Sequence, residues 1–122
     1  MINARVGELE LRTKRFAIDV IRLYGGLPHS TVAQVLGRQL LRSGTSVGAQ
    51  YREAMRAKSI ADFVSKIEGS LQEIEETRYW LDLLVESETV PPSAMTAVKS
   101  EASQLIAMFV ASVRTAKRRR NG

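Results

Sequence analysis

Residues 59–86 read SIADFVSKIEGSLQEIEETRYWLDLLVE, and apolar or small residues recur in this stretch alternately every three and four positions. This spacing places their side chains on one face of an α-helix. The positions on that face are Ile60, Phe63, Ile67, Ser70, Ile74, Thr77, Leu81 and Leu84. Ser59 and Asp62 have the spacing of a capping box, in which side chains bind the unpaired N–H groups at a helix start. The stretch predicts one long helix with a single buried face.

Three further blocks have the same spacing, and glycines and prolines separate them. Gly25 and Gly26 end the first block, Ser30 is the candidate N-cap of the second, and Pro91-Pro92 precedes the last. The predicted helices cover about residues 8–24, 31–56, 60–87 and 93–117, and a basic C-terminal tail follows at 117–122.

Length and connection lengths limit how these helices pack. The chain has 122 residues, the usual size of one domain, and no block has the strict alternation of a β-strand. Four helices joined by short connections pack with neighbouring helices antiparallel. We therefore expect an all-α protein with a single domain, residues 1–122, folded as an antiparallel up-down-up-down four-helix bundle.

The second predicted helix is unusually rich in small residues. They are Ser43, Gly44, Ser46, Gly48 and Ala49. Glycine and serine lower the propensity of an isolated helix, so their benefit must come from packing. We expect them to let another backbone approach this helix closely.

Residue types that commonly perform catalysis or bind metals are scarce. The chain has no cysteine and one histidine, His29, which lies in a predicted turn. Di-iron bundles need Glu-x-x-His pairs, and neither these pairs nor a Gly-x-Ser-x-Gly motif occurs. We therefore predict a non-enzymatic protein with no catalytic residue, no metal site and no cofactor. Glu73, Glu75 and Glu76 are interpreted as a solvated helix face.

No segment of the chain resembles a membrane-directing sequence. Charged residues interrupt the first fifteen positions, and no apolar run approaches the roughly 20 residues that cross a bilayer. The lack of cysteine is typical of a reducing compartment. We expect a soluble, cytoplasmic protein without a membrane partner.

Charge is distributed unevenly along the chain. The net charge is +5, yet residues 59–88 contain eight acids and two bases, which gives this stretch −6 and leaves +11 elsewhere. The residues expected to contact nucleic-acid phosphates are Arg38, Arg42, Arg52, Arg56, Lys117, Arg118, Arg119 and Arg120. In the alternative interpretation, the arginines of the second helix pair with acids of the third, within or between subunits. Both interpretations stay open for that helix.

The third and fourth predicted helices carry apolar residues in addition to their buried faces. A single bundle core does not readily cover all of them, so we predict that they form a subunit interface. These residues are Trp80, Leu83, Ile106, Val110 and Val113. The alternative is a wide core face within one chain.

The centre of the chain resembles a known bacterial family. The residues that carry the resemblance are LRSGTSVGAQYREA at 41–54, Asp62-Phe63, Lys66, and EIEETRYWLDLL at 73–84. They are similar to a four-helix bundle family named for proteins encoded in intervening sequences of large-subunit ribosomal RNA genes. That family includes the accessory variability determinant of diversity-generating retroelements. The two central helices carry the match, and the outer two agree by pattern only.

The resemblance implies a homopentamer of bundles around a central channel. It also implies that retroelement members bind a reverse transcriptase, and nucleic acid through basic surface. Gln50 departs from the family pattern, which commonly has asparagine there, so the longer amide must shift to make an equivalent hydrogen bond.

Residues and resemblance together favour a basic, self-associating accessory protein that binds the backbone of RNA or DNA. A reverse transcriptase is a candidate partner. The alternative is a protein-interaction scaffold with no nucleic-acid binding of its own.

Overall fold

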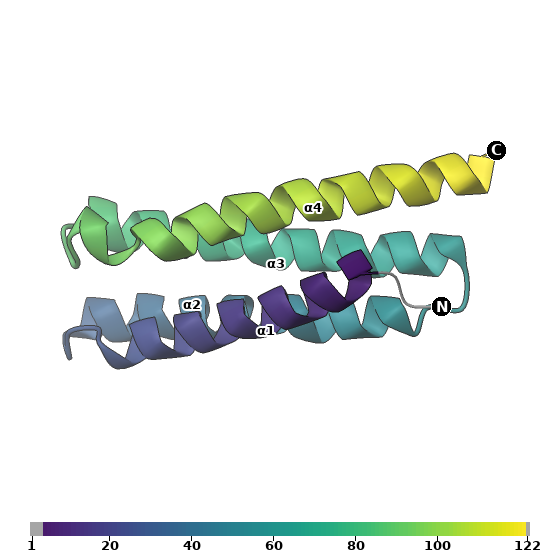
Figure 1. Cartoon of the computed structure of the whole chain (residues 1–122). Helices are drawn as coiled ribbons and strands as arrows, with labels where there is room; N and C mark the ends of the chain where they lie inside the picture. Colours follow the sequence, from purple (N-terminus) through teal and green to yellow (C-terminus); the bar gives the residue numbers. More distant parts are fainter. Residues whose placement is uncertain (1–3, 122) are drawn as a thin grey trace.

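Four long helices make up the described part of the chain, residues 4–121 of a computed structural model (Figure 1). They are α1 (Ala4–Gly25), α2 (Thr31–Met55), α3 (Ile60–Glu86) and α4 (Thr96–Asn121), with a 3-10 turn, η1 (Pro92–Ala94), before α4. Successive helices run in opposite directions, α2 packs between α1 and α3, and α4 packs mainly on α3. The predicted all-α, antiparallel four-helix bundle is confirmed.

The helix starts that were predicted from capping residues are correct. The Ser30 hydroxyl accepts a hydrogen bond from the N–H of Ala33 at 3.2 Å, and the Ser59 hydroxyl accepts one from the N–H of Asp62 at 3.0 Å. The Asp62 carboxylate in turn accepts the N–H of Lys58 at 3.1 Å. The Ser59 half of the capping box is therefore formed, whereas Asp62 binds the N–H of the residue before the N-cap instead of the N–H of Ser59.

The two outer helices are longer or shifted relative to the prediction. Helix α1 already begins at Ala4, and α4 begins at Thr96, because residues 92–94 form the separate turn η1. Helix α4 continues to Asn121, so residues 117–121 of the predicted tail are its last turns. Cations near a helix C-terminus interact favourably with the helix dipole, which supports helical structure in this basic run.

The buried face of each helix agrees with the spacing in the sequence, except at the ends. Ile67, Ile74, Leu81 and Leu84 of α3 are fully buried. Ile60 was expected in the same face but is 39% exposed, and Val64, 5% exposed, occupies the core instead. The reason is that Ile60 begins α3 at an open end of the bundle, where it lines a surface pocket.

Close packing between α1 and α2 depends on glycines of α2. A Cβ atom on Gly44 would lie 2.8 Å from both Cγ atoms of Val20, and one on Gly37 would lie 2.6 Å from Cδ1 of Leu27. Both distances are shorter than van der Waals contact, so a Cβ on Gly44 would displace Val20 of α1, and a Cβ on Gly37 would displace the end of the Leu27 side chain in the α1–α2 connection. Ala49 is exposed, so its expected role in close packing is wrong.

Hydroxyl groups join α2 to α3 inside the core. The Thr77 hydroxyl lies 2.9 Å from the Ser43 hydroxyl, and the Ser70 hydroxyl donates to the carbonyl of Val47 at 3.1 Å. Each side chain is buried and hydrogen-bonded, so the polar residues of the predicted seam cost little desolvation free energy. These bonds also set the register of α2 against α3.

An ion pair links the outer helices α1 and α4. Nη2 of Arg12 lies 2.7 Å from Oε1 of Glu101, and Nε of Arg12 donates to Oε2 at 2.9 Å. These hydrogen bonds raise the pKa of Arg12, so its guanidinium stays charged. The bidentate geometry fixes the orientation of α1 on α4 where the two helices have their limited contact.

Candidate nucleic-acid interface

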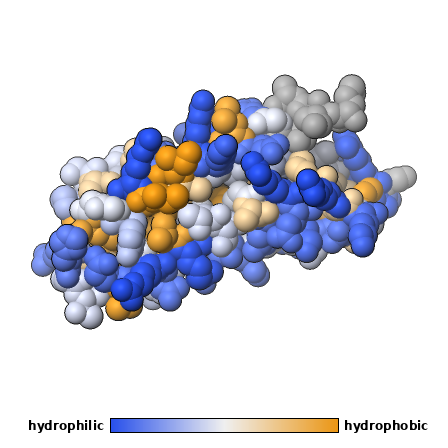
Figure 2. All heavy atoms as spheres, turned by 90° about the horizontal axis from the view of Figure 1, so that it is seen from below, coloured by the Kyte–Doolittle hydropathy of each residue, from blue (hydrophilic) through white to orange (hydrophobic). Residues whose placement is uncertain are grey.

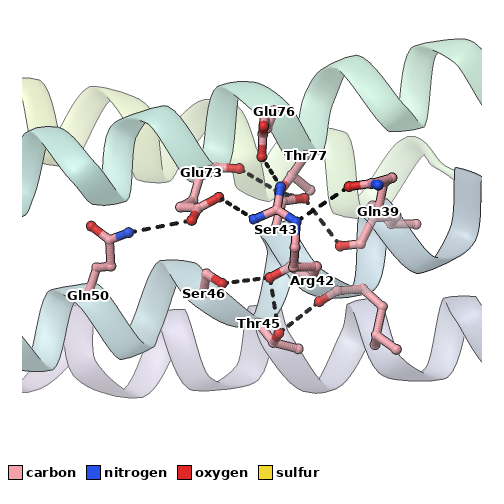
Figure 3. A network of polar contacts seen from close by, with 11 residues as sticks. Gln39, Arg42, Ser43, Thr45, Ser46, Gln50, Glu73, Glu76 and Thr77 are labelled. Carbon is pink, nitrogen blue, oxygen red and sulfur yellow. Dashed lines mark hydrogen bonds and ion pairs between the residues drawn. The ribbon is translucent and has the colours of Figure 1, made fainter.

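Arg42 lies in a polar network between α2 and α3 (Figure 3). Its Nη1 atom is 3.4 Å from Oε1 of Glu73, its Nη2 atom pairs with Glu76, and its Nε atom donates to Gln39 at 3.4 Å. Nε2 of Gln50 donates to the other oxygen of Glu73 at 3.4 Å. We call Arg42, Gln50, Glu73 and Glu76 the α2–α3 network.

Within this network, the acids that pair with Arg42 belong to its own chain. The hydrogen bond to Glu76 raises the pKa of Arg42. Burial raises the pKa of Glu73, whose side chain is only 16% exposed, although the charge of Arg42 acts in the opposite direction. Arg42 therefore pairs within the chain, as one of the two interpretations of α2 expected, and offers less charge to an external phosphate.

The Gln50 amide fits because α3 has a glycine opposite it. A Cβ atom on Gly69 would lie 1.9 Å from Oε1 of Gln50. The space that glycine leaves lets the longer amide lie against α3 and reach Glu73. The glycine of the neighbouring helix thus makes room for the longer amide in this chain.

The other predicted arginines of α2 fall into two groups. Nε of Arg52 lies 3.6 Å from a carboxylate oxygen of Glu10 in an exposed pair, which contributes little to stability. Arg38 and Arg56 are exposed and form no ion pair within residues 4–121. The predicted strip on α2 is therefore half paired and half unpaired.

The C-termini of α2 and α4 lie at the same end of the bundle (Figure 1), and basic side chains gather there. We call Arg56, Lys58, Arg118, Arg119 and Arg120 the bundle-end cations. All five are exposed, and none has an ion pair among the described residues. Lys117 beside them has a long pair, 3.8 Å from Glu68. Tertiary structure thus adds Lys58 to a cluster that was predicted mainly from α4.

A surface pocket of about 640 Å³ opens among these cations. We call it the end pocket. Lys58 and Arg119 line it together, although 61 positions separate them in the chain, so the α2–α3 connection and α4 converge there. The remaining lining residues are Tyr51, Ala54, Met55, Ala57, Ser59, Ile60, Phe63, Ser112, Thr115 and Ala116. Burial raises the pKa of Tyr51 to about 12, so its phenol is neutral at physiological pH.

The residues predicted for a subunit interface differ in exposure. Trp80, Leu83, Ile106 and Val110 are partly exposed, whereas Val113 is 7% exposed and belongs to the core of the chain. The Trp80 ring contacts Tyr79, at 5.1 Å between centroids, and its Nε1–H is buried without an acceptor among the described residues. An unpaired buried N–H is uncommon in folded proteins.

Apolar side chains outside this set are exposed on α1 and α2. Figure 2 views the bundle from the side of these helices and shows apolar groups among charged ones on this face. The most exposed of these apolar residues are Leu11, Ile18, Ile21, Val32 and Val35. In the sequence these residues occupy positions that do not belong to the buried face of their helix. An apolar residue at such a position is the signal that identifies them.

Other kinds of site find little support in the described residues. His29 is exposed in the α1–α2 connection and forms no hydrogen bond or ion pair within residues 4–121. No group of three or more histidines, aspartates or glutamates lies close enough to hold a metal ion within residues 4–121. None of the described helices combines the length and apolar character that crossing a bilayer requires.

Comparison with known proteins assigns the chain to a family. Residues 10–111 match the family model described as 23S rRNA-intervening sequence protein. A search of curated proteins gave no match. A crystal structure from Bacteroides thetaiotaomicron VPI-5482, described as a protein of unknown function from the S23 ribosomal protein family, is 31% identical with a TM-score of 0.83. The alignment covers 89% of this chain and 97% of that one. The resemblance found in the central helices is confirmed, and the chain belongs to the 23S rRNA-intervening sequence protein family.

Proposed function

We propose that this protein binds the phosphate backbone of RNA or DNA through the bundle-end cations. The observation that carries the proposal is that Arg56, Lys58 and Arg118–Arg120 meet at one end of the bundle without carboxylate partners among the described residues. Unpaired surface cations can exchange their counterions for phosphates, which is the main source of non-specific nucleic-acid affinity. Arg38 and Lys117 are secondary candidates, and Arg42 and Arg52 contribute less because acids already pair with them.

The opposite end of the bundle carries charges of both signs. Glu86 ends α3 and Glu88 follows two positions later, both exposed and without an ion pair in the described chain, whereas Arg22 is exposed in the last turn of α1. A nucleic acid is therefore attracted more strongly to the bundle-end cations. This difference favours contact through the α2 and α4 C-termini over uniform coating of the bundle.

We further propose that the protein acts without catalysis, as a self-associating accessory protein. The buried hydroxyls of Ser43, Ser70 and Thr77 hydrogen-bond within the bundle and do not face a base. The partly buried Trp80, whose N–H has no acceptor among the described residues, supports a protein partner on α3, either a second copy or a nucleic-acid enzyme such as a reverse transcriptase. The family name ties these proteins to an intervening sequence of 23S rRNA without stating an activity.

The test measures binding of labelled single-stranded RNA and duplex DNA at about 50 and about 200 mM salt. Several phosphate contacts predict that affinity falls by orders of magnitude across this range. The variant Arg118→Gln/Arg119→Gln/Arg120→Gln removes three bundle-end cations, whereas the control Lys14→Gln/Arg15→Gln/Arg22→Gln removes the same charge from exposed sites on α1. The first variant should lose most of the binding and the control little. Equal losses would contradict a localised interface, and no binding at low salt would contradict the proposal.

A protein-interaction scaffold is the second candidate function. The intramolecular pairing of Arg42 and Arg52 favours it, because it removes two of the arginines that were expected to bind phosphates. The partly exposed Leu83 lies on α3 near Trp80 in sequence, so Leu83→Glu would place a charge in a protein interface there. Light scattering should then show a smaller oligomer while the helical circular dichroism stays unchanged. An unchanged mass would exclude Leu83 from any self-interface.

A further inference from the structure

The end pocket combines an apolar wall with a basic rim. Ala54, Met55 and Phe63 contribute apolar surface from α2 and α3, and Ala116 closes the α4 side. Lys58 and Arg119 are the charged residues of the lining, which contains no aspartate or glutamate. The pocket therefore suits a ligand with a flat apolar part and a nearby negative charge.

An unpaired nucleotide has this chemistry. Its base offers apolar faces that stack on aromatic rings, and a phosphate on each side carries the negative charge. Phe63 is the half-buried aromatic residue of the lining, and the volume of about 640 Å³ leaves ample room for one base. Bases of a duplex are stacked and paired, so they cannot enter such a pocket unless they are first extruded, at a free-energy cost.

The position of the pocket matches the path of a bound strand. Arg118 and Arg120 flank Arg119 on the last turns of α4, and Arg56 precedes Lys58 at the end of α2. Lys58 and Arg119 line the pocket itself, so the phosphates on either side of a base held there have cations from two segments of the chain within the site. Electrostatic attraction along the path and stacking inside the pocket are the two components of single-strand binding sites.

We propose that the end pocket receives an unpaired base of single-stranded RNA or DNA while Lys58 and Arg119 bind the adjoining phosphates. This inference rests on the proposed function and extends it, because it specifies single-stranded nucleic acid as the ligand class. Cations alone would bind single strands and duplexes according to charge density. The pocket adds a preference for strands that carry accessible bases.

The experiment compares three probes of equal length: a single strand, an abasic strand with the same number of phosphates, and a duplex. The wild-type protein should bind the intact strand roughly fivefold or more tightly than the abasic strand, the lower limit for one stacked base. Ala116→Leu places three further carbon atoms in the pocket, where they narrow the space beside Phe63 without a change in charge. Its matched control, Ala107→Leu, makes the same substitution at an exposed position of α4 outside the lining.

In the Ala116→Leu variant the ratio of intact to abasic affinity should fall to near one, whereas Ala107→Leu should keep the wild-type ratio. Phe63→Leu, which preserves an apolar side chain but removes the ring, should also lower the ratio. Circular dichroism confirms that each variant is folded. Equal wild-type affinity for intact and abasic strands, or a duplex that binds as well as the intact strand, would overturn the inference while salt-dependent binding still supports the proposed function. No salt-dependent binding of any probe would overturn both.

Discussion

The α2–α3 network and the bundle end contain similar basic residues in opposite electrostatic situations. Arg42 of the network faces Glu73 and Glu76, which neutralise it within the chain. Lys58 and Arg119 at the bundle end line the same pocket, and this lining contains no acid. The comparison shows that the acids on neighbouring helices determine whether the charge of a cation is available to a ligand. The number of basic residues in a stretch of sequence matters less.

The paired cation of the network serves the stability of the fold, whereas the unpaired bundle-end cations are available for ligand binding. The partly buried carboxylate of Glu73 is stabilised by the charge of Arg42, so Arg42 contributes to the stability of the bundle. The bundle-end cations have no such task in the described structure, and each adds repulsion to its neighbours. Clusters of unpaired like charge persist more readily when a ligand neutralises them.

The largest expected effect comes from removing two unpaired cations at the bundle end, in comparison with two arginines of α2 that are paired within the chain. Arg56→Gln/Lys58→Gln should weaken binding of a single strand on the order of tenfold at low salt and reduce the slope of log affinity against log salt by about 2. Arg42→Gln/Arg52→Gln removes the same charge from paired sites and should leave the slope nearly unchanged. Affinity titrations over several salt concentrations measure both. A larger slope change in the second variant would reverse the comparison.

The free energy of unfolding should be more sensitive to the loss of a network cation than to the loss of a bundle-end cation. Arg42→Met should lower the free energy of unfolding by about 1 kcal/mol at pH 7, because two neighbouring carboxylates lose their shared cation. Arg118→Met should change it by less than about 0.5 kcal/mol, since this residue forms no ion pair within the described chain. Urea unfolding at neutral pH measures the two values. Equal losses would show that the network does not stabilise the bundle.

The pH dependence of stability tests the burial of Glu73. Burial raises the pKa of Glu73 in the folded state, so its stabilising contribution is present below the unfolded pKa of about 4.3 and is lost as pH rises through the folded value. Glu73→Gln lacks this titration. We expect the variant to be within about 0.5 kcal/mol of the wild type at pH 7 and relatively less stable near pH 4. Urea unfolding at both pH values measures this difference, and the opposite trend would mean that pairing with Arg42 dominates over burial.

The smallest effect is expected at Gly69, which makes room for Gln50. Gly69→Ala gains helix propensity of up to about 1 kcal/mol, but the new Cβ displaces the Gln50 amide from its place beside Glu73. We expect a net change of a few tenths, roughly 0.3 kcal/mol in either direction. In a Gln50→Ala background the same substitution should be clearly stabilising, and thermal unfolding of the four proteins gives the coupling. Additive changes would show that Gln50 moves away without cost.

Much of the fold follows from local patterns. The three-and-four spacing identifies most buried positions, and Ser30 and Ser59 mark helix starts, because a free N–H group near a serine hydroxyl is a local requirement. The errors lie where local patterns end: Ile60 is exposed, Val113 is buried, and the basic tail is helical. Each depends on how far neighbouring helices extend, which spacing within one helix does not describe.

The candidate site was harder to predict than the fold. The terminal basic run is visible in the sequence, and so is the arginine strip of α2. Lys58 stands just outside that strip, and only its approach to Arg119 makes it part of a pocket. Conversely, Arg42 belongs to the strip, but its pairing with Glu73 and Glu76 requires the register that Ser43 and Thr77 set between α2 and α3.

By itself, the sequence determined the helical class, the helix starts, the excess of positive charge and the family. These properties depend on residue types and on separations of a few positions, over which backbone geometry is regular. The tertiary structure alone decided which cations are paired and that the α2–α3 connection and α4 line one surface pocket. The reason is that ion pairing and cavity shape depend on distances of a few ångströms between helices, and those distances are set by the packing of the whole core.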